Sequence, residues 1–344
     1  MSKALAIKYR PTTFEDLTEQ SAVVKILTNQ IETGTIKHGY LFCGGAGTGK
    51  TTSARIFASM INKGLGMPIE LDAASNNSVD DVRRLSEDAQ TQALESEYKV
   101  FIIDECHSLS SQAWQAFLKT LEEPPAKSIF IFCTTNPEKI PQTILSRVQR
   151  YNFQRISFDG IVKRLEYIVN KEQNEQNKFT NVEKSAIEYI AKIADGGMRD
   201  AITLLDKCLS YNEVLSMDNV IAALGVADYE TMFALNEAYF DMEKMKVISI
   251  INEVYNSGMD LKLFVKTYFE FLLDLNVYAI SGELSNTKIP VTWQAKVEDY
   301  DNSRWEECYH LLTMVMDLLG EIKWEQNPKV VILAKFIIDM ESEE

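Results

Sequence analysis

The glycine-rich segment GGAGTGKT, residues 44–51, constrains this chain of 344 residues more than any other feature. It matches the pattern GxxxxGK[ST] and lies between an apolar run typical of a strand and an amphipathic run typical of a helix. Small residues there let backbone N–H groups surround phosphates at a helix N-terminus, as in a P-loop. The flanking elements disfavour a chance glycine-rich turn, so we predict a nucleotide site.

Within this loop, Lys50 is expected to reach the β- and γ-phosphates of the nucleotide, and the Thr51 hydroxyl to ligate Mg²⁺. The residues expected to contact the nucleotide are Gly44, Gly45, Ala46, Gly47, Thr48, Gly49, Lys50, Thr51 and Thr52.

The first 150 residues alternate short apolar runs with amphipathic stretches, which predicts a parallel α/β sheet. Because the runs contain almost no charge, we expect strands that are buried on both faces. These strands are expected at residues 39–44, 68–73, 99–105 and 128–135.

After Tyr151 the apolar spacing is helical, which predicts two further all-helical domains. The expected domains are residues 1–155, 156–212 and 213–344. The run VVILAKFII, residues 330–338, is expected to form a buried helix of the last domain, because it is too short to span a membrane.

Two acidic residues, Asp104 and Glu105, follow the apolar run VFII. Two acids after a strand usually belong to a solvated loop, but a P-loop upstream in the same sheet favours a Walker B motif. Asp104 would hold the Mg²⁺ and Glu105 would polarise the attacking water as general base. At the end of the next strand, one of Thr134, Thr135 and Asn136 could sense the γ-phosphate; the alternative is a strand-ending turn.

The formal net charge of −15 is unevenly distributed, since residues 211–344 carry 24 acidic and 10 basic groups. Phosphate neutralisation drives nucleic-acid affinity, so any DNA contact is expected in the first two thirds. Five cysteines without a CxxC pair, and the lack of a signal-peptide core or of an apolar run of about 18 residues, favour a reducing cytoplasm.

Several motifs occur in a fixed order along the chain: KYRP (8–11), the P-loop, LDAASNN (71–77), IIDECHSLS (102–110), FLKTLEEPP (117–125), TTNPEKIPQTILSR (134–147) and GGMRDA (196–201). Together they resemble the γ/τ family of bacterial DNA polymerase III clamp-loader subunits, which are AAA+ ATPases. The motifs extend to about Leu209. The last third is similar to the family's collar domain only in length and helical character.

This resemblance implies further site residues. Tyr9, Arg10 and Pro11, with Leu17, would line the adenine pocket. Thr135 would be sensor 1, and Arg199, beside Met198, would be sensor 2. Arg147 would be the arginine finger acting on ATP held by a neighbouring subunit; the alternative is an exposed arginine at a helix end.

The chain departs from the family at two points. Where the family carries a four-cysteine zinc module, this chain has only residues 62–67, so no zinc is expected. Cys43, Cys106 and Cys133 end three strands, but buried free thiols are a commoner explanation than a metal cluster. The family's SRC motif reads Ser146, Arg147, Val148 and keeps the arginine.

The resemblance also implies macromolecular contacts. Asn76, Asn77, Ser78 and Arg83 would meet the DNA backbone, although Arg83 and Arg84 could instead pair with acids on a solvated helix. Leu94 is the expected clamp anchor, and a core leucine is the alternative.

The resemblance implies an ATPase subunit of a sliding-clamp loader, which opens the clamp on binding ATP and releases it on primer-template DNA after hydrolysis. Its partners would be the clamp, the other subunits of a pentameric spiral and DNA, with no membrane contact. The alternatives are a branch-migration helicase, a non-catalytic loader subunit and a clamp-binding scaffold. The chain resembles a short γ-like form, bacterial and nucleoid-associated, or phage-encoded in the host cytoplasm.

Overall fold

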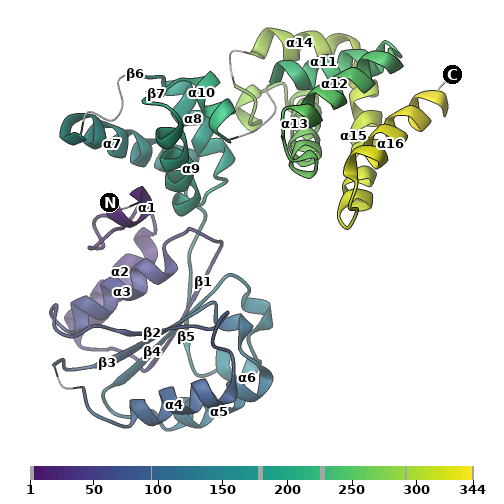
Figure 1. The fold of residues 1–344 in the computed structure, drawn as a ribbon. Coiled ribbons are helices and arrows are strands. Elements are labelled where there is room, and N and C mark those ends of the chain that lie inside the picture. The colour runs from purple at the N-terminus through teal and green to yellow at the C-terminus, as the bar shows by residue number, and fades with distance from the viewer. Residues whose placement is uncertain (1–3, 94, 177–180, 225–228, 291–292, 343–344) are drawn as a thin grey trace. The chain divides into compact units, whose positions relative to one another are not determined.

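The computed structural model describes residues 4–93, 95–176, 181–224, 229–290 and 293–342. The chain divides into two compact units. The first comprises Met1–Glu175 and Ala194–Asp206, and the second comprises Gln176–Ile193 and Lys207–Glu344. Figure 1 shows both units as ribbons.

The first unit is built on a five-stranded sheet in which every pairing is parallel. The strand order is β2-β3-β4-β1-β5. The strands are β1 (Gly39–Cys43), β2 (Ile69–Asp72), β3 (Lys99–Asp104), β4 (Ser128–Thr134) and β5 (Gln149–Asn152). The predicted parallel α/β fold is confirmed.

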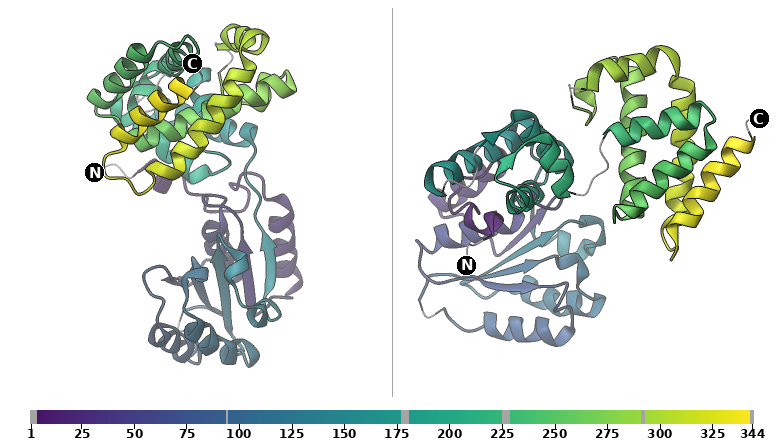
Figure 2. Two further views of the ribbon diagram at one scale, coloured as in Figure 1. Left: turned by 90° about the vertical axis from the view of Figure 1, so that its right-hand side faces the viewer. Right: turned by 45° about the horizontal axis from the view of Figure 1, so that its top comes forward.

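Helices cover both faces of this sheet, and the alternation of side chains along the strands explains why. Phe101 and Ile103 of β3 point into one apolar core, while Val100 and Ile102 point into the other. The helices α4 and α5 pack on the first face and α2 and α3 on the second (Figures 1 and 2). The helices of this unit are α1 (Leu5–Lys8), α2 (Ser21–Thr33), α3 (Lys50–Ile61), α4 (Val79–Ala89), α5 (Ser111–Glu122), α6 (Gln142–Leu145) and α7 (Phe158–Gln176), with the 3₁₀ helices η1 (Cys106–Ser108) and η2 (Pro137–Lys139).

Two strands differ from expectation. The edge strand β2 has mostly exposed side chains, so burial on both faces holds for β1 and β4 and for the middle of β3, but not for β2. The second difference is β5, which forms where strand patterning was expected to end. Only Tyr151 of its four residues is buried.

The second unit is helical apart from a two-stranded parallel ladder of β6 (Asn181–Val182) and β7 (Val214–Leu215). Its longest helix, α13, packs against α15 and buries aromatic residues such as Phe264 and Phe271. Its helices are α8 (Lys184–Ile193), α10 (Met217–Leu224), α11 (Tyr229–Phe240), α12 (Lys244–Asn256), α13 (Leu261–Ser281), α14 (Gln294–Ser303), α15 (Trp305–Ile322) and α16 (Pro328–Ser342), with the 3₁₀ helix η3 (Leu284–Asn286); α9 (Met198–Tyr211) begins in the first unit and ends in this one.

The run at residues 330–338 lies on α16 and is buried on one side only. Ile332 and Phe336 are buried, whereas Val330 is 59% and Ile338 65% exposed. The helix that was expected to be buried is therefore buried on one side only, and its other side exposes Val330 and Ile338. Among the described residues, no helix combines the length and the apolar character needed to cross a membrane.

Candidate nucleotide-binding site

The P-loop connects β1 to α3 and depends on glycine at two positions. Gly47 has a φ of +68° and Gly49 a φ of +99°. Residues other than glycine rarely adopt such positive φ values. The turn directs the chain into α3, whose first residue is Lys50. The Lys50 ammonium group donates hydrogen bonds to the carbonyl oxygens of Gly44 at 3.0 Å and Gly45 at 2.7 Å.

The acidic residues at the end of β3 lie against this loop. The Thr51 hydroxyl donates a 2.8 Å hydrogen bond to Oδ2 of Asp104. Hydroxyl and carboxylate oxygens are ligands that Mg²⁺ prefers, so this pair fits a magnesium ion bound beside the phosphates.

Glu105 follows directly and has a φ of +45°, unusual for a residue with a side chain. Oε2 of its carboxylate accepts a 3.1 Å hydrogen bond from the Thr135 hydroxyl at the end of β4. Parallel neighbouring strands end at the same edge of the sheet, and this is why residues 30 positions apart meet.

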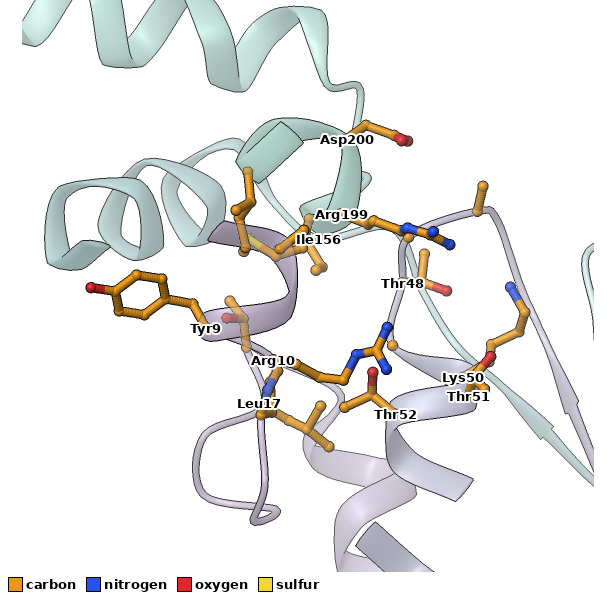
Figure 3. A pocket seen from close by; sticks show the side chains of 18 of the residues that line it. Tyr9, Arg10, Leu17, Thr48, Lys50, Thr51, Thr52, Ile156, Arg199 and Asp200 are labelled. Atoms are coloured by element: carbon orange, nitrogen blue, oxygen red, sulfur yellow. The ribbon is translucent and has the colours of Figure 1, made fainter. Parts of the chain in front are cut away.

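A cavity of about 280 Å³ opens beside the P-loop within the first unit (Figure 3). Most of the predicted nucleotide-contacting residues line it. They are Tyr9, Arg10, Pro11, Leu17, Ala46, Gly47, Thr48, Gly49, Lys50, Thr51, Thr52, Asp104, Glu105, Met198 and Arg199. Gly44, Gly45, Thr135 and Arg147 are not among the lining residues.

The start of α9 reaches this cavity because the segment GGMRD packs directly on the P-loop. The backbone N–H of Met198 donates a 3.1 Å hydrogen bond to the carbonyl oxygen of Gly47. A Cβ atom on Gly47 would come within 3.1 Å of the Cα of Gly197. Arg199 thereby reaches the wall of the cavity, near Thr48 in Figure 3.

Tyr9 lines the cavity, but its hydroxyl is engaged elsewhere. It donates a 2.7 Å hydrogen bond to Oε1 of Glu172, a fully buried carboxylate on α7. Burial first, and the bond to Glu172 second, raise the pKa of Tyr9 to about 12. Since its ring is directed away from the Thr52 side of the cavity (Figure 3), Tyr9 would present its backbone and ring edge to a ligand.

Sequence reasoning missed six residues of the cavity wall: Ala6, Thr18, Ile156, Arg164, Asp200 and Ile202. Of these, Asp200 was the easiest to predict from the sequence, because it follows Arg199 in the motif GGMRDA. Arg164 carried no local signal. It donates a 3.0 Å hydrogen bond to the Tyr9 carbonyl oxygen across 155 residues of sequence, a contact that only folding creates.

Arg147 lies between α6 and β5, outside the cavity wall. Its guanidinium donates hydrogen bonds to Oε1 of Glu122 at 2.7 Å and to the Thr143 carbonyl oxygen at 2.7 Å. Its side chain is 32% exposed, so part of the group faces solvent.

The four predicted DNA-contacting residues, Asn76, Asn77, Ser78 and Arg83, are all exposed at the start of α4. Ser78 caps this helix in a reciprocal capping box with Asp81. Arg83 pairs with Asp80 at 3.4 Å, not with an acid further along the helix. Asp80 and Asp81 occupy the first turn, so they offset part of the positive helix end. The predicted clamp anchor, Leu94, lies outside the described residues.

All five cysteines are free and buried. Burial raises the pKa of the Cys106 and Cys133 thiols well above the usual value, so both stay protonated near neutral pH. At the position of the family's zinc module, α3 ends at Ile61 and β2 begins at Ile69. The expectation that the chain carries no zinc stays a prediction.

Three family models match successive parts of the chain. Residues 68–157 match the model of the DNA polymerase III delta subunit. Residues 160–213 match the ATPase lid domain of the DNA polymerase III clamp loader subunit, and residues 215–330 match domain III of the gamma and tau subunits.

Curated relatives extend this similarity to most of the chain. The tau subunit of Bacillus subtilis DNA polymerase III is 34% identical over 95% of this chain and 61% of its own length. The Escherichia coli tau subunit is 35% identical over 75% of this chain and 43% of its own. The gamma subunit of Buchnera aphidicola (Schizaphis graminum) is 32% identical over 78% of each protein. The chain thus spans between two fifths and two thirds of the length of the two tau subunits.

Among solved structures, the Holliday junction branch migration motor RuvB of Thermotoga maritima is similar in fold. It superimposes with a TM-score of 0.51 over 76% of this chain and 90% of its own, at 19% identity. This likeness concerns the fold alone and supports an AAA+ architecture. With the family models and the relatives that match most of its length, the chain belongs to the DNA polymerase III gamma/tau family of clamp-loader subunits.

Proposed function

We propose that this chain is an ATP-hydrolysing subunit of a sliding-clamp loader that acts in DNA replication. The observation that carries the proposal is the convergence of Lys50, Thr51, Asp104, Glu105 and Arg199 on one cavity. Such a set supplies a phosphate-binding cation, ligands for a divalent cation and a general base. Because the chain belongs to a family of clamp-loader subunits, we assign this ATP hydrolysis to clamp loading.

In the proposed complex, ATP binds with its phosphates on the P-loop and its adenine towards Tyr9, Pro11 and Leu17. Lys50 leaves the carbonyl oxygens of Gly44 and Gly45 and meets the β- and γ-phosphates. In the P-loop, Lys50 thus already lies near the position that the phosphates of ATP would take.

Thr51 and Asp104 would hold Mg²⁺, since their oxygens already lie 2.8 Å apart at the mouth of the P-loop. When bound, Mg²⁺ neutralises charge on the β- and γ-phosphates. Thr51 can keep its hydrogen bond to Asp104 in this role, because donating its hydrogen leaves the lone pairs of the hydroxyl oxygen for the cation.

Glu105 orients the attacking water in the proposed reaction. Its Oε2 accepts a hydrogen bond from the Thr135 hydroxyl, so Oε1 remains to accept a proton from the water. The water oxygen forms a bond to the γ-phosphorus, the bond to the bridging oxygen breaks, and ADP leaves with the electron pair. Thr135 serves here as sensor 1 through its hydrogen bond to the Glu105 carboxylate.

Two arginines complete the proposed site. Arg199 contacts the γ-phosphate from α9, because the GGMRD segment is bonded to the P-loop. Arg147 acts as the finger on ATP held by a neighbouring subunit, and its place outside the cavity of its own chain supports this role. Each ATP would then stabilise a subunit interface, which explains how binding orders an assembly.

The remaining contacts follow from the same proposal. The functional boundaries are residues 1–155 for the nucleotide-binding domain, 156–212 for the lid and 213–344 for an acidic collar. The primer-template backbone is contacted by Asn76, Asn77, Ser78 and Arg83. The clamp is anchored by Leu94. Further subunits complete a pentamer. The five free buried cysteines support a cytoplasmic location.

The test is steady-state ATPase activity of the chain alone, with its clamp and partner subunits, and with these plus primed DNA. We expect a low basal rate that rises only when all components are present. A high basal rate, or stimulation by DNA without the clamp, would favour a helicase-like motor. ATP binding without turnover in every mixture would favour a scaffold.

A further inference from the structure

His107 lies between the general base and the strand that carries sensor 1. Its Nδ1 atom is 3.1 Å from Oγ1 of Thr134 and 3.3 Å from Oε2 of Glu105. The imidazole is 18% exposed and the Thr134 side chain is fully buried. The same carboxylate oxygen therefore has two polar neighbours, His107 and Thr135.

The protonation of the His107 Nδ1 atom is part of the inference, and its polar neighbours favour a hydrogen on this atom. Oγ1 of Thr134 accepts a 2.9 Å hydrogen bond from the backbone N–H of Asn136, and Oε2 of Glu105 accepts from Thr135. An unprotonated Nδ1 would place a lone pair 3.3 Å from a carboxylate, which is repulsive in a partly buried site. Nδ1 can donate to Oγ1 of Thr134 or accept from its hydroxyl, and only a protonated Nδ1 lies near Oε2 of Glu105 without this repulsion.

We infer that His107 is a positioning residue for Glu105: an imidazole protonated at Nδ1, 3.3 Å from Oε2, and the Thr135 hydroxyl together hold this oxygen, so that Oε1 is directed to the attacking water. The backbone supports this role, because Glu105 has left the regular geometry of β3, with a φ of +45°. Side-chain contacts, more than the ladder of the sheet, must fix its carboxylate. This inference rests on the proposed role of Glu105 in ATP hydrolysis.

Substitution of His107 by asparagine or by glutamine tests whether the protein needs a hydrogen-bond donor at the position of Nδ1 or only a side chain that fills the space. The amide nitrogen of asparagine can occupy the place of Nδ1, whereas that of glutamine reaches the place of Nε2. We expect His107→Ala and His107→Gln to lower kcat by about 10-fold to 100-fold, as misplacement of a catalytic group does. His107→Asn should retain most of the wild-type kcat, and ATP affinity should remain unchanged in all three.

A double-substitution cycle tests whether the effect passes through Glu105. In the clamp-loader assembly with primed DNA, His107→Ala is compared in the wild-type and Glu105→Gln backgrounds. The inference requires that His107→Ala cause no further loss of kcat once Glu105 is replaced. A general loss of folding would lower both backgrounds alike and would also weaken ATP binding.

The outcomes separate the inference from the function on which it rests. If Glu105→Gln leaves turnover unchanged, the proposed role of Glu105 fails. If Glu105→Gln lowers kcat by about 100-fold but His107→Ala behaves like the wild type, only the inference fails. Equal losses in His107→Asn and His107→Ala, or a gain of turnover in either, would also overturn it.

Discussion

The backbone N–H of Met198 donates a 3.1 Å hydrogen bond to the carbonyl oxygen of Gly47, which ties the start of α9 to the P-loop. At the same place Gly197 lies so close that a Cβ atom on Gly47 would approach its Cα to 3.1 Å, which requires one of the two segments to shift. The phosphate-binding turn and the segment that carries Arg199 are therefore one packed structure. We therefore expect a nucleotide that moves the P-loop to move Arg199 as well.

This contact makes Gly47→Ala a sensitive substitution. The new methyl group would meet Gly197 and the backbone nitrogen of Arg199 at 3.1 and 3.2 Å, so α9 must move away from the loop. We expect ATP affinity to fall at least about 10-fold, equivalent to about 1.4 kcal/mol, as measured by titration with a fluorescent nucleotide.

Gly34→Ala is the matched control for Gly47→Ala. Gly34 has nearly the same φ, +66° against +68°, but nothing lies within 4 Å of its added Cβ. Both variants carry similar backbone strain of about 1 kcal/mol. If both bind ATP equally well, the contact with Gly197 has no role in nucleotide binding.

Lys50→Ala and Glu105→Gln should separate ATP binding from hydrolysis. Removing the ammonium group deprives the phosphates of their cation, so Lys50→Ala should bind no measurable nucleotide. The isosteric amide cannot accept the proton from water, and Glu105→Gln should bind ATP but lower kcat by about 100-fold or more. Equilibrium binding and single-turnover hydrolysis measure the two steps. Equal loss of binding in both variants would contradict the assigned roles.

Arg147→Ala should affect only the assembly. Since Arg147 is absent from the cavity wall of its own chain, ATP affinity of the isolated variant should equal that of the wild type. Stimulated turnover with clamp, partners and primed DNA should fall by about 10³-fold, the usual contribution of an arginine finger.

Arg147→Lys provides the control for charge. Lysine keeps the positive charge but loses the planar, multidentate guanidinium, so we expect little recovery of stimulated turnover. If Arg147→Ala loses ATP binding in the isolated chain, the arginine serves its own site and the finger assignment is wrong.

Stability of the second unit should depend on pH through Asp274 of α13. Burial raises the pKa of Asp274 to about 6 from an ordinary value of 3.8, although the Lys288 N–H donates a 2.9 Å hydrogen bond to it. Between these values the folded chain binds the proton more tightly than the unfolded chain. The free energy of unfolding should therefore decrease as pH rises from about 4 to about 6.

Asp274→Asn should remove this pH dependence, because the amide keeps an acceptor for Lys288 without carrying charge. Urea denaturation followed by circular dichroism at pH 4, 5, 6 and 7 measures the effect. At pH 7 the variant should be more stable by at most about 3 kcal/mol, the free energy that corresponds to this shift in pKa. A variant whose stability varies with pH as steeply as that of the wild type would show that another group is responsible.

Local patterns were sufficient for the parts of the fold that carry the nucleotide site. Neighbours in the sequence are enough to predict the P-loop glycines, the lysine that follows them and the acids after VFII. The strands β1, β3 and β4 are so apolar that the sequence alone predicts them. The strand β5 escaped prediction because QRYN buries a single side chain at the edge of the sheet.

Contacts between distant residues required the folded chain. The parallel register of β3 and β4 brings Thr134 and Thr135 beside His107 and Glu105, and nothing in the local sequence marks His107 as a neighbour of the general base. Glu172 likewise reads as a solvated acid on a helix, yet it is buried against Tyr9. Backbone turns and strand burial follow from local sterics and hydrophobicity, whereas the partners of these polar side chains are set by the packing of elements that lie 27 to 163 residues apart in the sequence.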